Sequence, residues 1–132
     1  LSADVQTAYL QAELLGRPVY LALPKDLWPD EWFLDGSRRE APRFKKPVLR
    51  LRKAIYGLRR SGFDWRTHAD AILQAQGWAP VVDHQEAMYV LPYIDSGGKP
   101  AVHCMVMYVD DLLASGEAVH LAASLERLRE QQ

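Results

Sequence analysis

Two adjacent carboxylates, Asp110 and Asp111, follow an apolar run and are the residues of this sequence best suited to chemistry. Residues 102–108 predict a buried strand, and residues 112–114 predict the strand that returns beside it. Both aspartates are then expected in the tight turn, where their side chains can point into one volume. Like charges held together repel unless a cation lies between them. The pattern therefore predicts a divalent-metal site, and Mg²⁺ suits it because this ion prefers oxygen ligands and phosphates.

A third acid, Asp4, lies near the start of the sequence, where a strand end is expected to lead into a short helix over residues 7–14. A carboxylate at a helix N-terminus is stabilised by backbone N–H groups, which can also receive a phosphate. An ordinary N-cap is the alternative for Asp4. An exposed turn is the alternative for the pair, because aspartate hydrogen-bonds its own backbone readily in turns.

The composition fits one folded domain. The chain has 132 residues, of which 48% are hydrophobic, and a net charge of −1, so a core can form and a disordered chain is not expected. Its basic residues are concentrated. Between residues 43 and 66 nine basic side chains face one acid, Asp64. These basic residues are Arg43, Lys45, Lys46, Arg50, Arg52, Lys53, Arg59, Arg60 and Arg66. A polyanion partner explains this block, and a solvated loop is the alternative.

The single cysteine, Cys104, lies in the predicted buried strand and has no disulfide partner in the sequence. This favours a reducing, intracellular compartment. The apolar runs fall short of the roughly 20 residues that span a bilayer, so no membrane partner is expected. The sequence begins at Leu1 inside an expected ordered element, which predicts a fragment of a longer protein.

The remaining periodicities predict an α+β domain. Further strands are expected over residues 17–23 and 86–94, and amphipathic helices over residues 61–76 and 117–129. A long proline-bearing connection is expected over residues 25–47. The strands before and after the turn at residues 95–98 make an antiparallel meander with the strand that carries the Asp pair.

Three segments, in order, resemble the motifs of the copia-type retrotransposon reverse transcriptases. They read DVQTAYL at residues 4–10, LRKAIYGLR at residues 51–59 and YVDD at residues 108–111. The resemblance runs through nearly the whole chain. It departs from the family after Leu58, where the family commonly reads KQAPRAW and this chain reads RRSGFDW. Trp65 is kept, whereas the change of lysine to Arg59 alters the donor geometry and hence the expected nucleotide contacts.

This resemblance implies an α+β reverse-transcriptase palm over residues 1–132, with part of the fingers. Such a palm is an antiparallel sheet with a ferredoxin-like core, backed by helices. The family's catalytic acids correspond to Asp4, Asp110 and Asp111, which would hold two Mg²⁺ ions, with Mn²⁺ as the alternative ion, for nucleotidyl transfer.

The resemblance also implies roles for residues around the nucleotide. Tyr9 corresponds to the aromatic side chain that lies beneath the sugar and excludes a 2′-hydroxyl, with a plain core aromatic as the alternative. Tyr56 and Gly57 correspond to the segment that borders the incoming nucleotide and the template. Arg59 and Arg60 are expected to add contacts to phosphates or to the template backbone.

The implied partners are deoxynucleoside triphosphates, a primed RNA or DNA template, and the rest of a polyprotein with its fingers, thumb and ribonuclease H. A cytoplasmic particle or the nucleus is the expected location. The isolated chain is expected to hold template and primer poorly. Alternatives are a catalytically silent module that binds nucleic acid or protein, a small α+β binding domain, and a metal-dependent phosphohydrolase.

Overall fold

The computed structural model of the protein describes residues 1–81 and 87–129. The chain divides into two compact units. The sheet unit comprises Leu1–Glu13 and Lys53–Gln132, and the hairpin unit comprises Leu14–Arg52.

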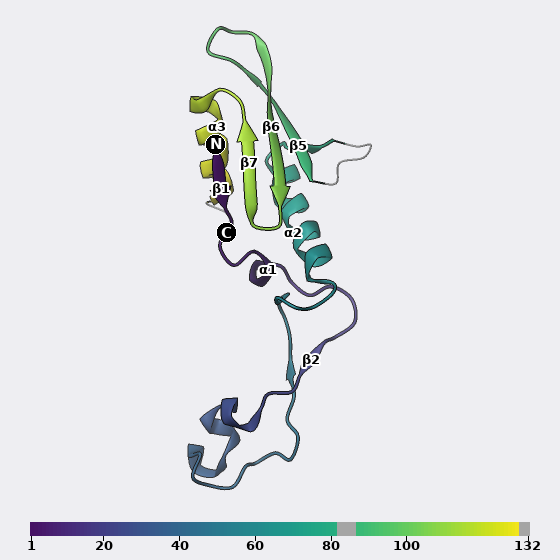
Figure 1. The fold of residues 1–132 in the computed structure, drawn as a ribbon, viewed down its shortest axis with the longest axis vertical. Coiled ribbons are helices and arrows are strands. Elements are labelled where there is room, and N and C mark those ends of the chain that lie inside the picture. Colours follow the sequence, from purple (N-terminus) through teal and green to yellow (C-terminus); the bar gives the residue numbers. More distant parts are fainter. Residues whose placement is uncertain (82–86, 130–132) are drawn as a thin grey trace. The chain divides into compact units, whose positions relative to one another are not determined.

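The sheet unit is built on a five-stranded antiparallel sheet with the order β1-β7-β6-β5-β4 (Figure 1). Its strands are β1 Ser2–Asp4, β4 Ala79–Pro80, β5 Met88–Ile94, β6 Pro100–Tyr108 and β7 Asp111–Ser115. The expected meander is present, because β5, β6 and β7 pair in turn with their neighbours. Strand β1 closes this side of the sheet by pairing with β7, more than 100 residues away in the sequence. The predicted strand over residues 86–94 is confirmed from Met88 onward, and Glu86 lies outside the described residues.

Three helices complete the sheet unit: α1 Ala8–Gln11, α2 Ser61–Ala75 and α3 Ala118–Arg129. The predicted helices over residues 61–76 and 117–129 are confirmed to within one residue at each end. Helix α2 buries Trp65, Ala69 and Leu73 on one stripe, and α3 buries Leu121 and Leu128. The spacing of these residues is that of an amphipathic helix with one face on a core.

Gly77 ends α2 as a glycine C-cap. Its φ of +88° is in the left-handed region, where glycine has no steric penalty. The N–H of Gly77 donates to the carbonyl of Gln74 (3.0 Å), and the N–H of Trp78 donates to the carbonyl of Leu73 (3.0 Å). These bonds satisfy carbonyls at the helix end and turn the chain toward β4.

Strand β6 differs from its prediction as a fully buried strand. His103, Met105 and Met107 are buried, whereas the intervening side chains are exposed. The prediction that Cys104 is buried is therefore wrong. Helices α2 and α3 supply the buried partners of one face only, so alternate side chains of an apolar strand remain on an open face.

The hairpin unit contains a short antiparallel pair, β2 Tyr20–Leu21 and β3 Leu49–Arg50. The predicted strand over residues 17–23 is thus reduced to two residues. The expected connection over residues 25–47 contains three single 3₁₀ turns: η1 Lys25–Leu27, η2 Asp30–Trp32 and η3 Leu34–Gly36. Aromatic contacts organise it, with Trp28 5.7 Å from Trp32 and 6.1 Å from Phe33 between ring centroids.

The part of the chain that the structure describes contains no helix with the length and apolar character needed to cross a membrane.

Candidate active site

Strands β1 and β7 bring two of the predicted acids together. Asp4, the last residue of β1, lies directly opposite Asp111, the first residue of β7. Tyr108, at the end of β6, pairs with Asp111 from the other side. Directly opposed residues of antiparallel strands project from the same face, so these three side chains share one face of the sheet. All three are exposed, which places them on the open face rather than against the helices.

Asp110 lies in the turn that precedes β7. The prediction that both aspartates of the pair occupy this turn is wrong for Asp111, because the turn consists of Val109 and Asp110 alone. The carbonyl of Asp110 accepts a hydrogen bond from the N–H of Val5 (2.7 Å), immediately after Asp4. The end of β1 and the turn after β6 therefore lie side by side, which brings the backbones of the three predicted acids close together. Asp4 is not an N-cap, since the residue that precedes α1 is Thr7.

Two residues beside these acids have unfavourable backbone conformations. Val109, next to Asp110, has φ +56°, and Thr7, three residues after Asp4, has φ +53°. Positive φ is rare for β-branched residues, because the branched side chain crowds the backbone. Such strain persists only where surrounding structure imposes it, and it is concentrated at functional sites.

Trp65 of α2 is one of the residues that hold Val109 in this conformation. Its indole Nε1–H donates to the carbonyl of Val109 (2.7 Å), and its ring is buried. The sequence does not predict this contact. The available signal is chemical: a buried tryptophan carries an N–H that needs an acceptor.

The donor chemistry of the three acids fits Mg²⁺, because all three offer hard carboxylate oxygens. Their side chains are not gathered into a finished ligand set. Across residues 1–81 and 87–129, no group of three or more His, Cys, Asp or Glu side chains has an arrangement that could hold a metal ion. Mg²⁺ usually keeps waters and takes substrate phosphates as ligands, so paired carboxylates such as Asp4 and Asp111 suit it without an all-protein cage.

Tyr9 and Tyr56 lie together in the sheet unit. Their ring centroids are 4.6 Å apart, with an interplanar angle of 54°. Tyr56 is 59% exposed. Gly57 has φ +92°, and a Cβ atom there would meet no atom within 4 Å. The backbone conformation, not a close approach, is thus what favours glycine at position 57.

The two arginines predicted to contact phosphates differ in their surroundings. Arg59 is exposed. Arg60 binds Asp64 through two hydrogen bonds, from Nε to Oδ2 (2.8 Å) and from Nη2 to Oδ1 (2.9 Å). The Asp64 side chain is fully buried, and the Arg60 guanidinium pairs with both of its carboxylate oxygens. Arg60 is therefore paired within the protein through two of its nitrogens, and the phosphate contacts expected of Arg59 and Arg60 stay predictions.

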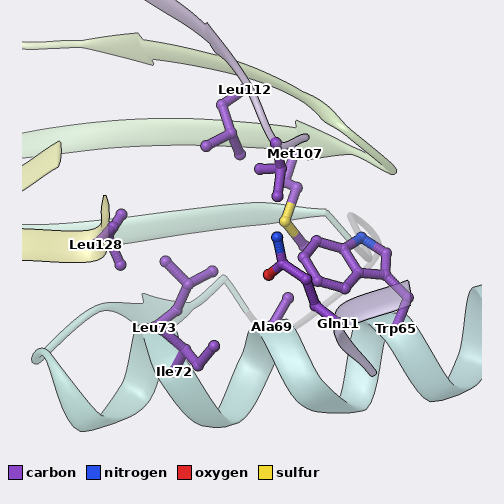
Figure 2. A pocket seen from close by; sticks show the side chains of 9 residues that line it. Gln11, Trp65, Ala69, Ile72, Leu73, Met107, Leu112 and Leu128 are labelled. Atoms are coloured by element: carbon purple, nitrogen blue, oxygen red, sulfur yellow. The ribbon is translucent and has the colours of Figure 1, made fainter. Parts of the chain in front are cut away.

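A small apolar cavity of about 40 Å³ lies on the covered side of the sheet (Figure 2). It lies between the apolar stripe of α2, the sheet residues Met107 and Leu112, and Leu128 of α3. The cavity faces the core and lies across the sheet from the exposed acids. We interpret it as a packing gap.

Comparison with known proteins points to a mobile element. No protein-family model matches the chain, and no solved structure matches it. The chain is 31% identical, over 126 residues and 95% of its length, to the retrovirus-related Pol polyprotein from transposon RE2 of Arabidopsis thaliana. It spans only 7% of the length of that polyprotein. This similarity supports the origin of the chain in a retrotransposon polyprotein.

Proposed function

We propose that the chain is the palm region of an RNA-directed DNA polymerase, the reverse transcriptase of a copia-type retrotransposon. The observation that carries the proposal is the register of β1 and β7, which sets Asp4 opposite Asp111 with Asp110 in the adjoining turn. The similarity to a Pol polyprotein supports it independently. A phosphohydrolase or an unrelated binding domain would explain the acids, but not their combination with the Tyr9 and Tyr56 pair.

In this proposal Asp4, Asp110 and Asp111 would hold two Mg²⁺ ions. The ions would supply the activation of the primer 3′-hydroxyl and the neutralisation of the triphosphate. The aspartates would determine where the Mg²⁺ ions lie. The short turn keeps the backbone of Asp110 beside that of Asp4. Tyr9 and Tyr56 offer an aromatic surface for the sugar and base of the incoming nucleotide, and Gly57 gives the backbone bend beside it.

The hairpin unit supports a nucleic-acid partner. Its residues, Leu14–Arg52, include nine basic and five acidic side chains, whereas the chain as a whole has a net charge of −1. Lys45, Lys46 and Arg50 are exposed, and Tyr20, paired with Arg50, is 60% exposed. Exposed cations with an aromatic ring are the usual means of binding phosphates and unstacked bases. We assign the template backbone to this surface, and the fingers, thumb and ribonuclease H to other parts of the polyprotein.

Primer extension on an RNA template with Mg²⁺ tests the proposal, using the chain extended at both ends to the full polymerase region. Asp110→Asn should reduce extension at least about 100-fold, because a metal ligand contributes several kcal/mol to the transition state. Asp95→Asn is the matched control. Asp95 also lies in a hairpin turn, where its Oδ1 accepts two backbone N–H groups, and the asparagine oxygen can do the same.

Extension that survives Asp110→Asn would contradict the proposal. A wild-type protein that folds and binds template but does not extend the primer would point instead to a silent module that retains the fold.

A further inference from the structure

The Val109–Asp110 turn is held by two hydrogen bonds from other elements. The N–H of Val5, just after β1, donates to the carbonyl of Asp110, and the indole N–H of Trp65, on α2, donates to the carbonyl of Val109; both distances are 2.7 Å. Each residue of the turn thus has its carbonyl fixed. The bond from Val5 belongs to the backbone and is independent of side-chain identity, whereas the bond from Trp65 depends on one indole nitrogen.

The backbone conformation of this turn has to be stabilised by contacts from other elements. A two-residue hairpin turn with positive φ normally uses glycine, asparagine or aspartate, and here the residue is valine at φ +56°. Valine itself disfavours that conformation. The buried indole fixes the carbonyl that follows the strained φ, so it stabilises the one backbone conformation that carries Asp110 next to Asp4.

The start of α2 also holds the segment that contains Tyr56 and Gly57. The Ser61 hydroxyl, at the first residue of α2, donates to the carbonyl of Ile55 (2.6 Å), and Ser61 is 1% exposed. The first turns of α2 therefore hold two segments of the candidate site. Ser61 holds the segment that contains Tyr56, and Trp65 holds the turn that contains Asp110. A residue on a rigid helix is well suited to such positioning.

We propose that Trp65 is a positioning residue for the metal-binding aspartates. Its indole N–H sets the direction of the Asp110 carboxylate by fixing the Val109 carbonyl, without touching substrate itself. This inference rests on the proposed polymerase function. It assigns to Trp65 a role that its place on the apolar stripe of α2 does not require, since phenylalanine would fill such a stripe without the N–H.

Trp78 supplies a matched control within the same unit. Its ring is also buried, at 2% exposed, but its Nε1–H has no hydrogen-bond partner among the described residues. Trp78→Phe thus removes a buried indole without leaving an acceptor unpaired, whereas Trp65→Phe leaves the Val109 carbonyl without its donor. Both changes cost similar apolar volume, so the hydrogen bond is the main difference between the two variants.

The test measures both variants in the extended polymerase, by amide hydrogen exchange over residues 108–112 and by single-turnover nucleotide incorporation at a series of Mg²⁺ concentrations. Trp65→Phe should speed exchange in the turn, lower the maximal incorporation rate about 10-fold and raise the Mg²⁺ concentration needed for half the maximal rate. The KM for the nucleotide should change little. Trp78→Phe should match the wild-type protein in exchange over residues 108–112 and in Mg²⁺ dependence.

Unchanged exchange in Trp65→Phe, or a Mg²⁺ dependence equal to that of Trp78→Phe, would overturn the positioning role. A fall in melting temperature with wild-type kinetics in the folded protein would also overturn it, since that result is expected of a packing residue. Failure of the polymerase proposal gives a different pattern: the wild-type protein is inert, and Asp110→Asn changes nothing. That pattern also overturns the catalytic part of this inference, while the exchange data still decide whether Trp65 holds the turn.

Discussion

The two hairpin turns at opposite ends of β6 are built by different means. The turn between β5 and β6 uses residues suited to turns: Gly98 has φ +77°, and the Asp95 carboxylate accepts the N–H groups of Gly97 (2.9 Å) and Lys99 (2.8 Å). The turn between β6 and β7 places Val109 at φ +56° and holds it with bonds from Trp65 and Val5. The first turn is formed by its own residues and receives an added contact from Glu117, whose carboxylate accepts from the N–H of Ser96 (3.0 Å). The second turn has no such local bonds from its own side chains among the described residues and depends on tertiary contacts.

This difference indicates where the fold retains an unfavourable backbone conformation, namely the positive φ of Val109. A glycine or asparagine at position 109 would form the second turn without help from α2. Strained backbone that is kept by its surroundings is concentrated at functional sites, and here it adjoins the candidate catalytic acids. The end of the sheet without these acids shows no such strain in its turn, but it contains a tightly packed histidine.

That histidine, His103, lies near the β5–β6 turn. It is fully buried, and neither of its ring nitrogens has a hydrogen-bond partner among the residues that the structure describes. Its ring stacks on Tyr93, with centroids 3.8 Å apart and an interplanar angle of 5°. A Cβ atom on Gly116 would lie 2.0 Å from His103 Nδ1. Close packing around His103 therefore adds to the hydrogen bonds at this end of the sheet, whereas the acid-bearing end is held by hydrogen bonds to its strained turn.

The largest expected effect at the His103 end comes from Gly116→Ala. The added methyl group cannot fit beside the His103 ring without moving the strand or the ring, so we expect a loss of about 3 kcal/mol in the free energy of unfolding. Chemical denaturation measures it. Ser115→Ala, at the neighbouring exposed position of β7, is the control and should change stability by less than about 0.5 kcal/mol. An equal effect of the two substitutions would show that this end is not tightly packed.

The pH dependence of stability should also arise at this end. Burial, followed by the nearby charge of His120, lowers the pKa of His103 below its usual 6.5, while Glu117 acts in the opposite direction. The unfolded chain then takes up a proton before the folded protein does. Stability attributable to His103 is complete above pH 6.5 and is lost as the pH falls below 6.5 toward the folded pKa, by up to about 1.4 kcal/mol per pH unit.

Denaturation at several pH values between 7.5 and 5 measures this loss, and His103→Phe is the matched variant, because it keeps an aromatic ring but cannot take up a proton. The slope below pH 6.5 should be smaller in the variant than in the wild-type protein. If the two slopes agree, another group is responsible.

The sequence predicted the elements of this fold better than their pairing. The helices α2 and α3 were located to within one residue, because apolar spacing is a local signal. The opposition of Asp4 and Asp111 is not local, since it joins residues more than 100 positions apart, and only the motif resemblance indicated it. The exposure of Cys104 was missed because a strand of apolar residues does not show that only one face of its sheet is covered.

In the candidate site, too, local features were predictable from the sequence and long-range features were not. The ion pair of Arg60 with Asp64 has the i, i+4 spacing of helical salt bridges, and that spacing was a usable signal. The two-residue turn was not predictable, because Val109 contradicts the residue preferences of such turns. Its conformation is set by Trp65 and Val5, whose positions in space depend on the complete fold.

The smallest expected effects compare the two turns directly. Gly98→Ala places a side chain at φ +77° in open space, so its cost is one of backbone conformation alone, about 1 kcal/mol. Val109→Asn should act in the opposite direction and stabilise the protein by about 0.5 kcal/mol, because asparagine tolerates positive φ better than valine. Thermal or chemical denaturation of both variants measures the pair of effects. Destabilisation by Val109→Asn would mean that packing of the half-buried valine outweighs its backbone strain, so that backbone strain would no longer distinguish the two turns.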